Sequence, residues 1–231
     1  MPNWCDNTVS LQHNDASMIE RAEQAFMRGE LMNEFHPCPK ELHETVAGFC
    51  GAGTYQQELL ELKQTLNRKW FGSKDWYDWQ VSHWGSKWDV GMSCGGGDGN
   101  VYKESANSIS LSFLSAWSPP IQFYEKLVYL GFTVRAYYHE GGIGFCGVWS
   151  DEYDEHYDII GNSKWVTENI PDEIDQIFCI SSNMFEWDIE HLQESIDELI
   201  EKIEGEGCEE TCAKYKAEIE ELRAELEELL V

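Results

Sequence analysis

Basic residues are scarce in this chain. Its 231 residues include 16 Lys and Arg side chains against 43 Asp and Glu, which gives a formal net charge of -27 at pH 7. Proteins that bind bare nucleic acid or an anionic membrane surface need basic patches, so this charge argues against either partner. Cationic proteins, metal ions and proteins that themselves bind nucleic acid are the partners it favours. The alternative is that the acidity only keeps an aromatic-rich protein in solution.

Paired cysteines and long apolar runs are also missing. The eight cysteines contain no CxxC pair and have neither the spacing of a disulfide framework nor that of a zinc ribbon. No apolar run approaches the ~20 residues of a membrane span. The opening MPNWCDN has neither the basic region nor the apolar run of a signal peptide. We therefore expect free thiols in a reducing cytoplasm, no metal site and no membrane partner.

A recognisable catalytic motif is absent from the sequence. The glycine-rich stretch 91–100 is followed by a strand pattern instead of the helix that a phosphate-binding loop requires, so we expect a hairpin-like connection there. The acid–base candidates are His139 beside Glu140, and His83 near Asp89. A single histidine with a nearby carboxylate is more often structural than catalytic. The sequence thus predicts a protein that is not an enzyme and carries no cofactor.

The first 150 residues alternate between strand and helix patterns. Strand patterns occupy 4–11, 108–114, 132–138 and 144–149, and helices with one apolar face are predicted at about 15–29, 55–69 and 121–130. A loop with one short helical turn is expected over 35–54, and a solvated acidic loop over 151–158. With one more strand in the aromatic stretch described next, this order predicts an α+β domain over residues 1–158, with an antiparallel sheet and an insertion at about 33–70.

The most distinctive stretch is WFGSKDWYDWQVSHWGSKW, residues 70–88, which holds five of the ten tryptophans. Residues 79–84 alternate between two sets of side chains in the way of a strand with two partly buried faces. Indole rings on such a strand either fill the core or stack a ligand such as a nucleobase. The candidate residues for ligand or partner binding are Trp76, Tyr77, Trp79, His83, Trp84, Lys87, Trp88 and Trp117.

The last third of the chain has a different pattern. Residues 159–188 are expected to form a connecting or edge segment, and residues 189–231 carry apolar side chains at intervals of three and four around a glycine turn. This pattern predicts coiled-coil-type helices that either fold back as a hairpin or pair with another copy of the chain. We favour self-association. The residues expected to mediate it are Tyr215, Ile219, Leu222, Leu226 and Leu229.

Four segments of the first 150 residues resemble a known family. The opening MPNWCDN, the run WYDWQVSHWGSKWD, the helix start LSAWSPP and the hairpin YYHEGGIGFCGVW are similar to those of the YubB-type ferredoxin-like family of bacteriophage and conjugative-plasmid proteins, which includes Api-type phage proteins. The resemblance implies a β-α-β-β-α-β ferredoxin-like core and a place in the cytoplasm of a host bacterium. It implies no catalytic residues.

Two hypotheses of function follow. The first is a non-enzymatic protein, encoded by a phage or plasmid, that binds and inhibits or modulates a host protein, such as a nucleic-acid-binding or defence protein. Its acidic surface would then imitate DNA. The second is a small-ligand module that sequesters a nucleotide or a nucleotide-derived signal in a pocket formed by the tryptophan-rich stretch. We expect a homo-oligomer under either hypothesis.

Overall fold

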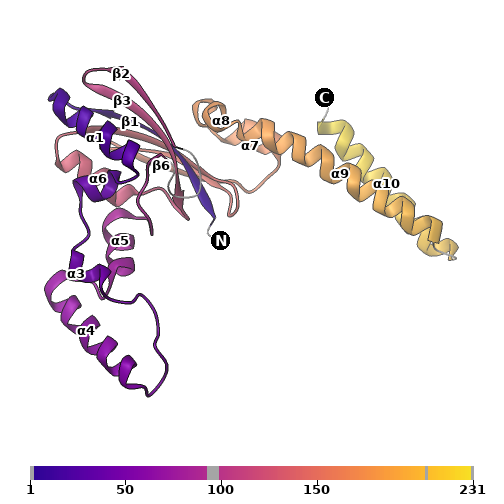
Figure 1. Cartoon of the computed structure of the whole chain (residues 1–231). Coiled ribbons are helices and arrows are strands. Elements are labelled where there is room, and N and C mark those ends of the chain that lie inside the picture. Colours follow the sequence, from indigo (N-terminus) through magenta and orange to yellow (C-terminus); the bar gives the residue numbers. More distant parts are fainter. Residues whose placement is uncertain (1–2, 93–98, 206–207, 230–231) are drawn as a thin grey trace. The chain divides into compact units, whose positions relative to one another are not determined.

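The computed structural model describes residues 3–92, 99–205 and 208–229. The chain divides into two compact units, residues 1–158 and residues 159–231, which are described separately (Figure 1). The glycine-rich stretch lies mostly outside the described residues, together with Cys94.

A six-stranded antiparallel sheet forms the centre of the first unit, so the protein has a mixed α/β fold. The strand order is β2-β3-β1-β4-β5-β6. The strands are β1 (Trp4–Gln12), β2 (Asn100–Ser105), β3 (Ser108–Ala116), β4 (Thr133–Glu140), β5 (Phe145–Ser150) and β6 (Asp154–Asp158). The central strand β1 pairs with β3 on one side and β4 on the other, and Val9 lies between Leu111 and Ala136.

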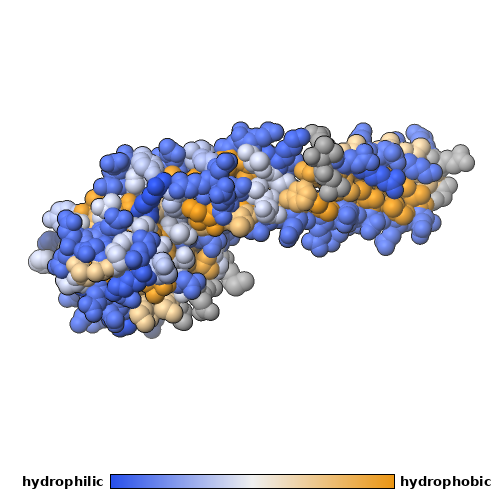
Figure 2. Space-filling model, turned by 90° about the horizontal axis from the view of Figure 1, so that it is seen from above, coloured by the Kyte–Doolittle hydropathy of each residue, from blue (hydrophilic) through white to orange (hydrophobic). Residues whose placement is uncertain are grey.

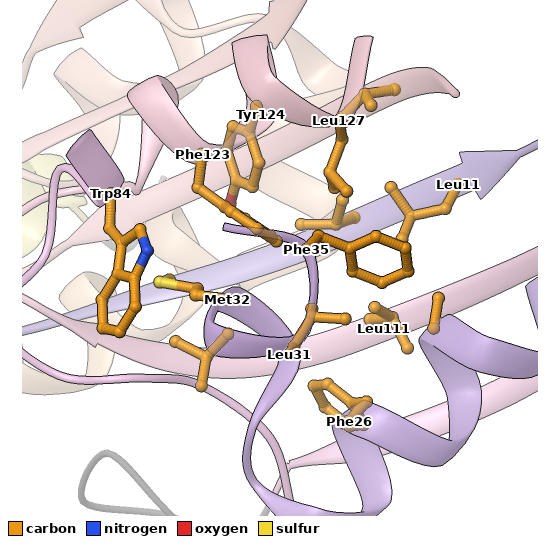
Figure 3. Packing of buried hydrophobic residues seen from close by; sticks show 14 of the residues in the cluster. Leu11, Phe26, Leu31, Met32, Phe35, Trp84, Leu111, Phe123, Tyr124 and Leu127 are labelled. Carbon is orange, nitrogen blue, oxygen red and sulfur yellow. The ribbon is translucent and has the colours of Figure 1, made fainter. Parts of the chain in front are cut away.

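Alternating apolar residues turn one face of this sheet toward two helices, α1 (Ala16–Arg28) and α6 (Ile121–Tyr129) (Figure 1). Side chains two residues apart point to the same face, so Val9 and Leu11 of β1 are both fully covered. Figure 3 shows Phe26 near Leu111, Leu127 near Leu11, and Phe123 between Tyr124 and Phe35. The core of the first unit therefore lies between the sheet and its helices.

Most of the elements expected from the sequence are confirmed. Helix α1 begins where the Asp15 carboxylate accepts from the Ser17 backbone N–H at 2.9 Å, and it ends at Gly29, whose φ of 74° suits a left-handed C-cap. The predicted strands at 4–11, 108–114, 132–138 and 144–149 are β1, β3, β4 and β5. The acidic segment 154–158, expected to be a loop, forms the edge strand β6 instead. An edge strand tolerates charged residues because one side has no strand neighbour.

The centre of the tryptophan-rich stretch is a helix, so the predicted strand is wrong. Helix α5 (Trp76–Trp84) starts at Asp75, whose side chain accepts from the Asp78 backbone N–H at 2.9 Å, and it ends at Gly85 with φ 81°. The alternation that suggested a strand covers only six residues. These two caps, and the burial of Trp79 and Trp84 toward the core, suit a helix.

Helices α2 (Leu31–Phe35), α3 (Lys40–His43) and α4 (Tyr55–Phe71) precede α5, and all four lie between α1 and β2 in the chain. Helix α4 starts where Thr54 Oγ1 accepts from the Gln57 backbone N–H at 3.2 Å, and it ends at Gly72 with φ 75°. Figure 1 shows α4 lying apart from the sheet, on the far side of α3.

The second unit is helical throughout its described elements. It consists of α7 (Ser163–Asn169), α8 (Asp172–Phe178), α9 (Ile180–Gly205) and α10 (Glu209–Leu229). Residues 159–188, expected to be a connecting or edge segment, thus contribute two helices and the start of a third. Buried Asp188 of α9 accepts from the backbone N–H and the hydroxyl of Ser163 at 2.9 and 2.7 Å, which satisfies the start of α7.

Helices α9 and α10 fold back on each other along an apolar seam. Its buried residues are Ile196, Leu199 and Ile219, and Ile203, Tyr215 and Leu222 pack against them. Figure 2 shows an apolar strip along the hairpin with hydrophilic residues on both sides. The hairpin therefore covers the seam residues within the chain, while part of the apolar strip stays at the surface.

Candidate binding sites

Five side chains of the first unit gather into an aromatic patch: Trp4, Tyr77, Lys87, Trp88 and Trp117. The Lys87 ammonium lies 4.5 Å from the centre of the Trp88 ring and 5.7 Å from those of Tyr77 and Trp117. The Trp88 and Trp117 rings stack with an interplanar angle of 17° and centroids 6.2 Å apart, and Trp4 lies 5.8 Å from Trp88 on another side. A cation held among three aromatic faces is a favourable electrostatic arrangement.

Three chain segments bring the patch together. Trp4 opens β1 and Trp117 follows β3, and the backbone N–H of Trp117 donates to the Asn3 carbonyl at 2.9 Å. Lys87 and Trp88 follow the end of α5. The Ser118 hydroxyl donates to the Gly85 carbonyl at 3.1 Å, which ties the end of α5 to the end of β3. The patch is therefore positioned by the sheet and α5 together.

Trp117 has a backbone conformation that is costly for a tryptophan. Its φ is 67°, in the left-handed region, where a non-glycine residue costs roughly 1–2 kcal/mol. The hydrogen bond to Asn3 and the stack on Trp88 hold it there, and its side chain stays 39% exposed. Backbone strain of this kind concentrates at functional positions, so Trp117 is the residue of the patch with the strongest indication of a role.

The eight predicted site residues divide between this patch and the core. Trp79 and Trp84 are 5% and 1% exposed, and the Trp84 indole N–H donates to the His36 carbonyl at 2.8 Å. Trp76 packs against the same core. Tyr77, Lys87, Trp88 and Trp117 remain at the surface patch. Sequence reasoning missed Trp4, although it lies in MPNWCDN, one of the four segments that carry the family resemblance.

His83 lies among aromatic rings beside the core. Its ring stacks on Trp79 with centroids 4.3 Å apart and an interplanar angle of 8°. The His36 ring lies 4.9 Å from Trp79 and 5.6 Å from His83. Burial, followed by the positive charge of Lys126 and the proximity of His83, lowers the pKa of His36. The neutral imidazole therefore suits this position.

The acid–base pair His139 and Glu140, considered from the sequence, has a structural role in the fold. Buried Glu140 accepts from the backbone N–H groups of Gly142 and Ile143 at 2.9 and 2.6 Å, which fixes the turn between β4 and β5. His139 faces Asp6 across the β1–β4 pair, and burial lowers the pKa of His139 and raises that of Asp6. Both residues thus serve the sheet and its turn.

Asp89 also has a structural role. Its carboxylate accepts from the backbone N–H groups of Met32, Asn33 and Val90 at 2.7, 2.9 and 2.8 Å. Met32 and Asn33 lie in the first turn of α2, whose own N-cap residue makes no side-chain cap. Asp89 therefore caps α2 from a distant part of the chain.

Metal-binding clusters and membrane-spanning helices are both absent from the described residues. In residues 3–92, 99–205 and 208–229, no group of three or more His, Cys, Asp or Glu side chains is placed to hold a metal ion. Within the same ranges, every helix is too short or too polar to cross a membrane.

The second unit concentrates acidic charge. Residues 159–231 carry 21 of the 43 acidic side chains and 5 of the 16 basic ones. The exposed acidic residues of α9 are Glu186, Glu190, Glu194, Asp197, Glu198, Glu201 and Glu204. Those of α10 are Glu210, Glu218, Glu220, Glu221, Glu225 and Glu227. These carboxylates lie outside the apolar seam, on the faces that the hairpin presents to solvent.

The residues expected to mediate self-association lie on α10. Tyr215, Ile219 and Leu222 pack into the seam with α9, so the chain itself covers them. Leu222 and Leu229 also line a cleft of about 220 Å³ beside Trp187 and His191 of α9. Leu226 is half-buried. Three of the five side chains, Tyr215, Ile219 and Leu222, thus have partners inside their own hairpin.

Comparison with known proteins adds little to this description. No family model matches the chain, and no curated protein is a significant match. The crystal structure of protein api92 from Yersinia pseudotuberculosis, of family DUF1281, is similar with a TM-score of 0.38 and 11% sequence identity. The alignment covers 70% of this chain and 99% of that one. Such a low score carries no argument about fold or function.

Proposed function

We propose that this chain is a non-enzymatic interaction protein that binds a basic or nucleic-acid-binding host protein through the acidic outer faces of α9 and α10. The observation that carries the proposal is the concentration of 21 acidic and 5 basic side chains in residues 159–231. The hairpin has its own apolar seam, so it can present this charge without a partner. A strong negative field speeds association with a basic protein surface.

The spacing of these carboxylates supports imitation of DNA. Glu190, Glu194, Glu198 and Glu201 follow one another at intervals of three or four residues, so they share one face of α9. At the rise of an α-helix, residues four apart are about 6 Å apart along the axis. Ion pairs reach Glu198 from Lys202 and Glu220 from Arg223 at 3.5 and 3.1 Å, and exposed pairs of this kind neutralise little. The row therefore offers repeated negative charge to a DNA-binding surface.

The proposed setting is the cytoplasm of a host bacterium, with the gene carried by a phage or plasmid and the target a component of host defence. The resemblance to the YubB-type family motivates this setting. The core elements β1, α1, β2, β3, α6 and β4, with the strand order β2-β3-β1-β4, support the ferredoxin-like core that this family implies.

Charge-neutralised variants test this proposal. The variant E190Q/E194Q/E198Q/E201Q removes one acidic row and leaves the seam unchanged. The control E20Q/E41Q/E44Q/E125Q removes the same charge from exposed positions of the first unit. We expect tagged wild-type protein and the control to retain the same basic host proteins from bacterial lysates, and the α9 variant to lose them. Equal retention by all three proteins contradicts the proposal.

A second candidate function is supported by the aromatic patch. Its indole faces can stack a nucleobase, at ~1–3 kcal/mol per base, and Lys87 can meet a phosphate or another anionic group. The strained backbone of Trp117 is the observation that favours it. We propose as the alternative that this patch sequesters a nucleotide or a nucleotide-derived signal.

Calorimetric titration with a panel of linear and cyclic nucleotides tests the alternative. We expect binding by the wild type, and its loss in the W117A and K87A variants with an unchanged fold by circular dichroism. The matched control is W187A, which removes an indole that is 60% exposed in the other unit. If no nucleotide binds at concentrations up to the millimolar range, the alternative fails.

A further inference from the structure

Helix α4 exposes a continuous row of large apolar side chains, here called the α4 stripe. Its members are Tyr55 (73% exposed), Leu59 (47%), Leu62 (59%), Leu66 (49%) and Trp70 (74%). At 100° per residue they fall within about 80° of the helix circumference. Exposed apolar residues that are scattered singly need no explanation, whereas a contiguous row of five marks an interaction surface.

An adjacent side of α4 faces the rest of the unit and fixes the orientation of this stripe. Leu60 and Asn67 are buried, and the Asn67 amide donates to Thr45 Oγ1 at 2.9 Å and to the Lys74 carbonyl at 2.8 Å. The Lys63 ammonium donates to the Glu44 carbonyl at 2.8 Å. These bonds hold that side of α4 against the unit and leave the stripe exposed.

We propose that the α4 stripe is the contact through which two copies of this chain pair, with their α4 helices antiparallel. The stripe is self-complementary in that orientation. Four of its members, Tyr55, Leu59, Leu66 and Trp70, are arranged symmetrically about a point between residues 62 and 63, and Leu62 lies beside that point. A two-fold axis at this point places Tyr55 against Trp70 of the second copy and Leu59 against Leu66 of the second copy. The two Leu62 side chains meet near the axis.

The charges beside the stripe fit the same register. Glu58 lies in the first turn of α4 and Lys69 in the last turn, and both are exposed on the same side of the stripe. In the antiparallel pair each Glu58 faces Lys69 of the second copy, so two ion pairs flank the apolar contact. In a parallel pair, the two-fold axis would run along the helices and place Glu58 and Lys69 of the two copies on opposite flanks of the contact, so neither ion pair would form. The opposed helix dipoles also favour the antiparallel arrangement.

A second copy is therefore the occupant that the stripe fits best. The expected affinity is modest, because one helix from each copy makes an interface at the low end of the range for specific contacts. We expect a dimer that forms at micromolar concentrations. This inference does not depend on the acidic hairpin, whose seam residues are paired within the chain.

Sedimentation velocity of the full chain across micromolar concentrations tests the pairing. We expect the wild type to pass from monomer to dimer, and L62E/L66E to stay monomeric with an unchanged thermal transition, since both side chains are about half exposed. The control Y129E/I143E places two charges on apolar side chains that are 82% and 71% exposed elsewhere in the unit, and it should dimerise like the wild type. A wild type that is monomeric throughout, or a dimer that survives L62E/L66E, overturns the proposal.

Charge exchange tests the register. E58K alone and K69E alone each place like charges opposite one another, so each should weaken its own dimer by roughly tenfold or more. In a heterodimer of the two variants, the two positive side chains of the E58K copy face the two negative side chains of the K69E copy. An equal mixture of the two variants therefore restores both ion pairs and should dimerise like the wild type. The double variant E58K/K69E should do the same. If neither the mixture nor the double variant recovers, antiparallel pairing through α4 is wrong.

Discussion

The Tyr124 hydroxyl donates to Asn7 Oδ1 at 2.9 Å inside the core of the first unit, where both residues are at most 2% exposed. The Asn7 amide in turn donates to the Cys5 carbonyl and to Ser115 Oγ, both at 2.8 Å. One buried side chain thus links α6, β1 and β3. Polar groups in a core are stabilising only when each has a partner, so this network is sensitive to the loss of any member.

Tyr124→Phe removes one donor of this network and leaves the ring in place. We expect a loss of about 1–2 kcal/mol in the free energy of unfolding, because the buried Asn7 carbonyl oxygen loses the donor that satisfies it. Urea unfolding followed by tryptophan fluorescence measures this. Tyr129→Phe is the control, because Tyr129 is 82% exposed and its change should stay within about 0.5 kcal/mol. Equal effects of the two substitutions would contradict the role given to the Asn7 network.

Asp89→Ala removes the acceptor that caps α2. Three backbone N–H groups, those of Met32, Asn33 and Val90, lose their carboxylate partner. We expect a destabilisation of about 2–3 kcal/mol in urea unfolding, more than for an exposed helix cap, because this one carboxylate satisfies three backbone donors. Asp15→Ala at the start of α1 is the matched comparison, since that cap is exposed and should cost about 1 kcal/mol.

The Asp89 carboxyl also makes the stability of the fold depend on pH, and the sign of this dependence follows from its pKa. Burial raises the pKa of Asp89 from its ordinary 3.8 to about 6, although its three N–H donors act in the opposite direction. The folded state therefore holds this proton more tightly than the unfolded state. The stability gained in this way is complete below pH 3.8 and is lost as the pH rises through about 6. In Asp89→Asn this loss should be absent, as measured by urea unfolding at a series of pH values between about 4 and 7.

The effect of His36 on the pH dependence of stability has the opposite sign. Burial, Lys126 and His83 lower its pKa below the ordinary 6.5, so the unfolded state binds a proton more readily than the folded state. Its contribution to stability is present above pH 6.5 and is lost as the pH falls toward the lowered pKa. We expect His36→Gln to flatten the fall in stability on the acid side, and Asp89→Asn to steepen it. Identical pH profiles for the two variants would refute this assignment.

The sequence predicts the elements of the first unit where one signal dominates. The strands β1 and β3 and the capped helix α1 are recognisable because more and less buried side chains alternate or step along them, and β4 and β5 because two apolar runs are joined by a glycine turn. The edge strand β6 is not recognisable, because its residues Asp154–Asp158 are almost all exposed and its place depends on backbone pairing with β5. The local sequence of a strand gives little indication of which distant strand it pairs with.

The sequence predicts only some of the residues of the aromatic patch, because here too the local pattern is ambiguous. Tryptophan suits a strand, a buried helix face and a binding surface equally well, so the stretch 70–88 does not separate Trp84 from Trp88. The signals that do separate them are the caps, Asp75 before and Gly85 after, which define α5 and leave Trp88 beyond its end. Trp4 joins the patch through the pairing of β1 with β3, and no local pattern reveals that contact.

Trp84 and Trp88 offer a direct test of this division between core and patch. Trp84→Ala deletes a ring that is 1% exposed and leaves the His36 carbonyl without its indole donor, so we expect a loss of about 3–5 kcal/mol in the free energy of unfolding. Trp88→Ala deletes a partly exposed ring and should cost about 1 kcal/mol. Urea unfolding of both variants, read by far-UV circular dichroism, compares them. If Trp88→Ala destabilises the fold as much as Trp84→Ala, the Trp88 ring is part of the core, and the aromatic patch is structural instead of a surface free to bind a ligand.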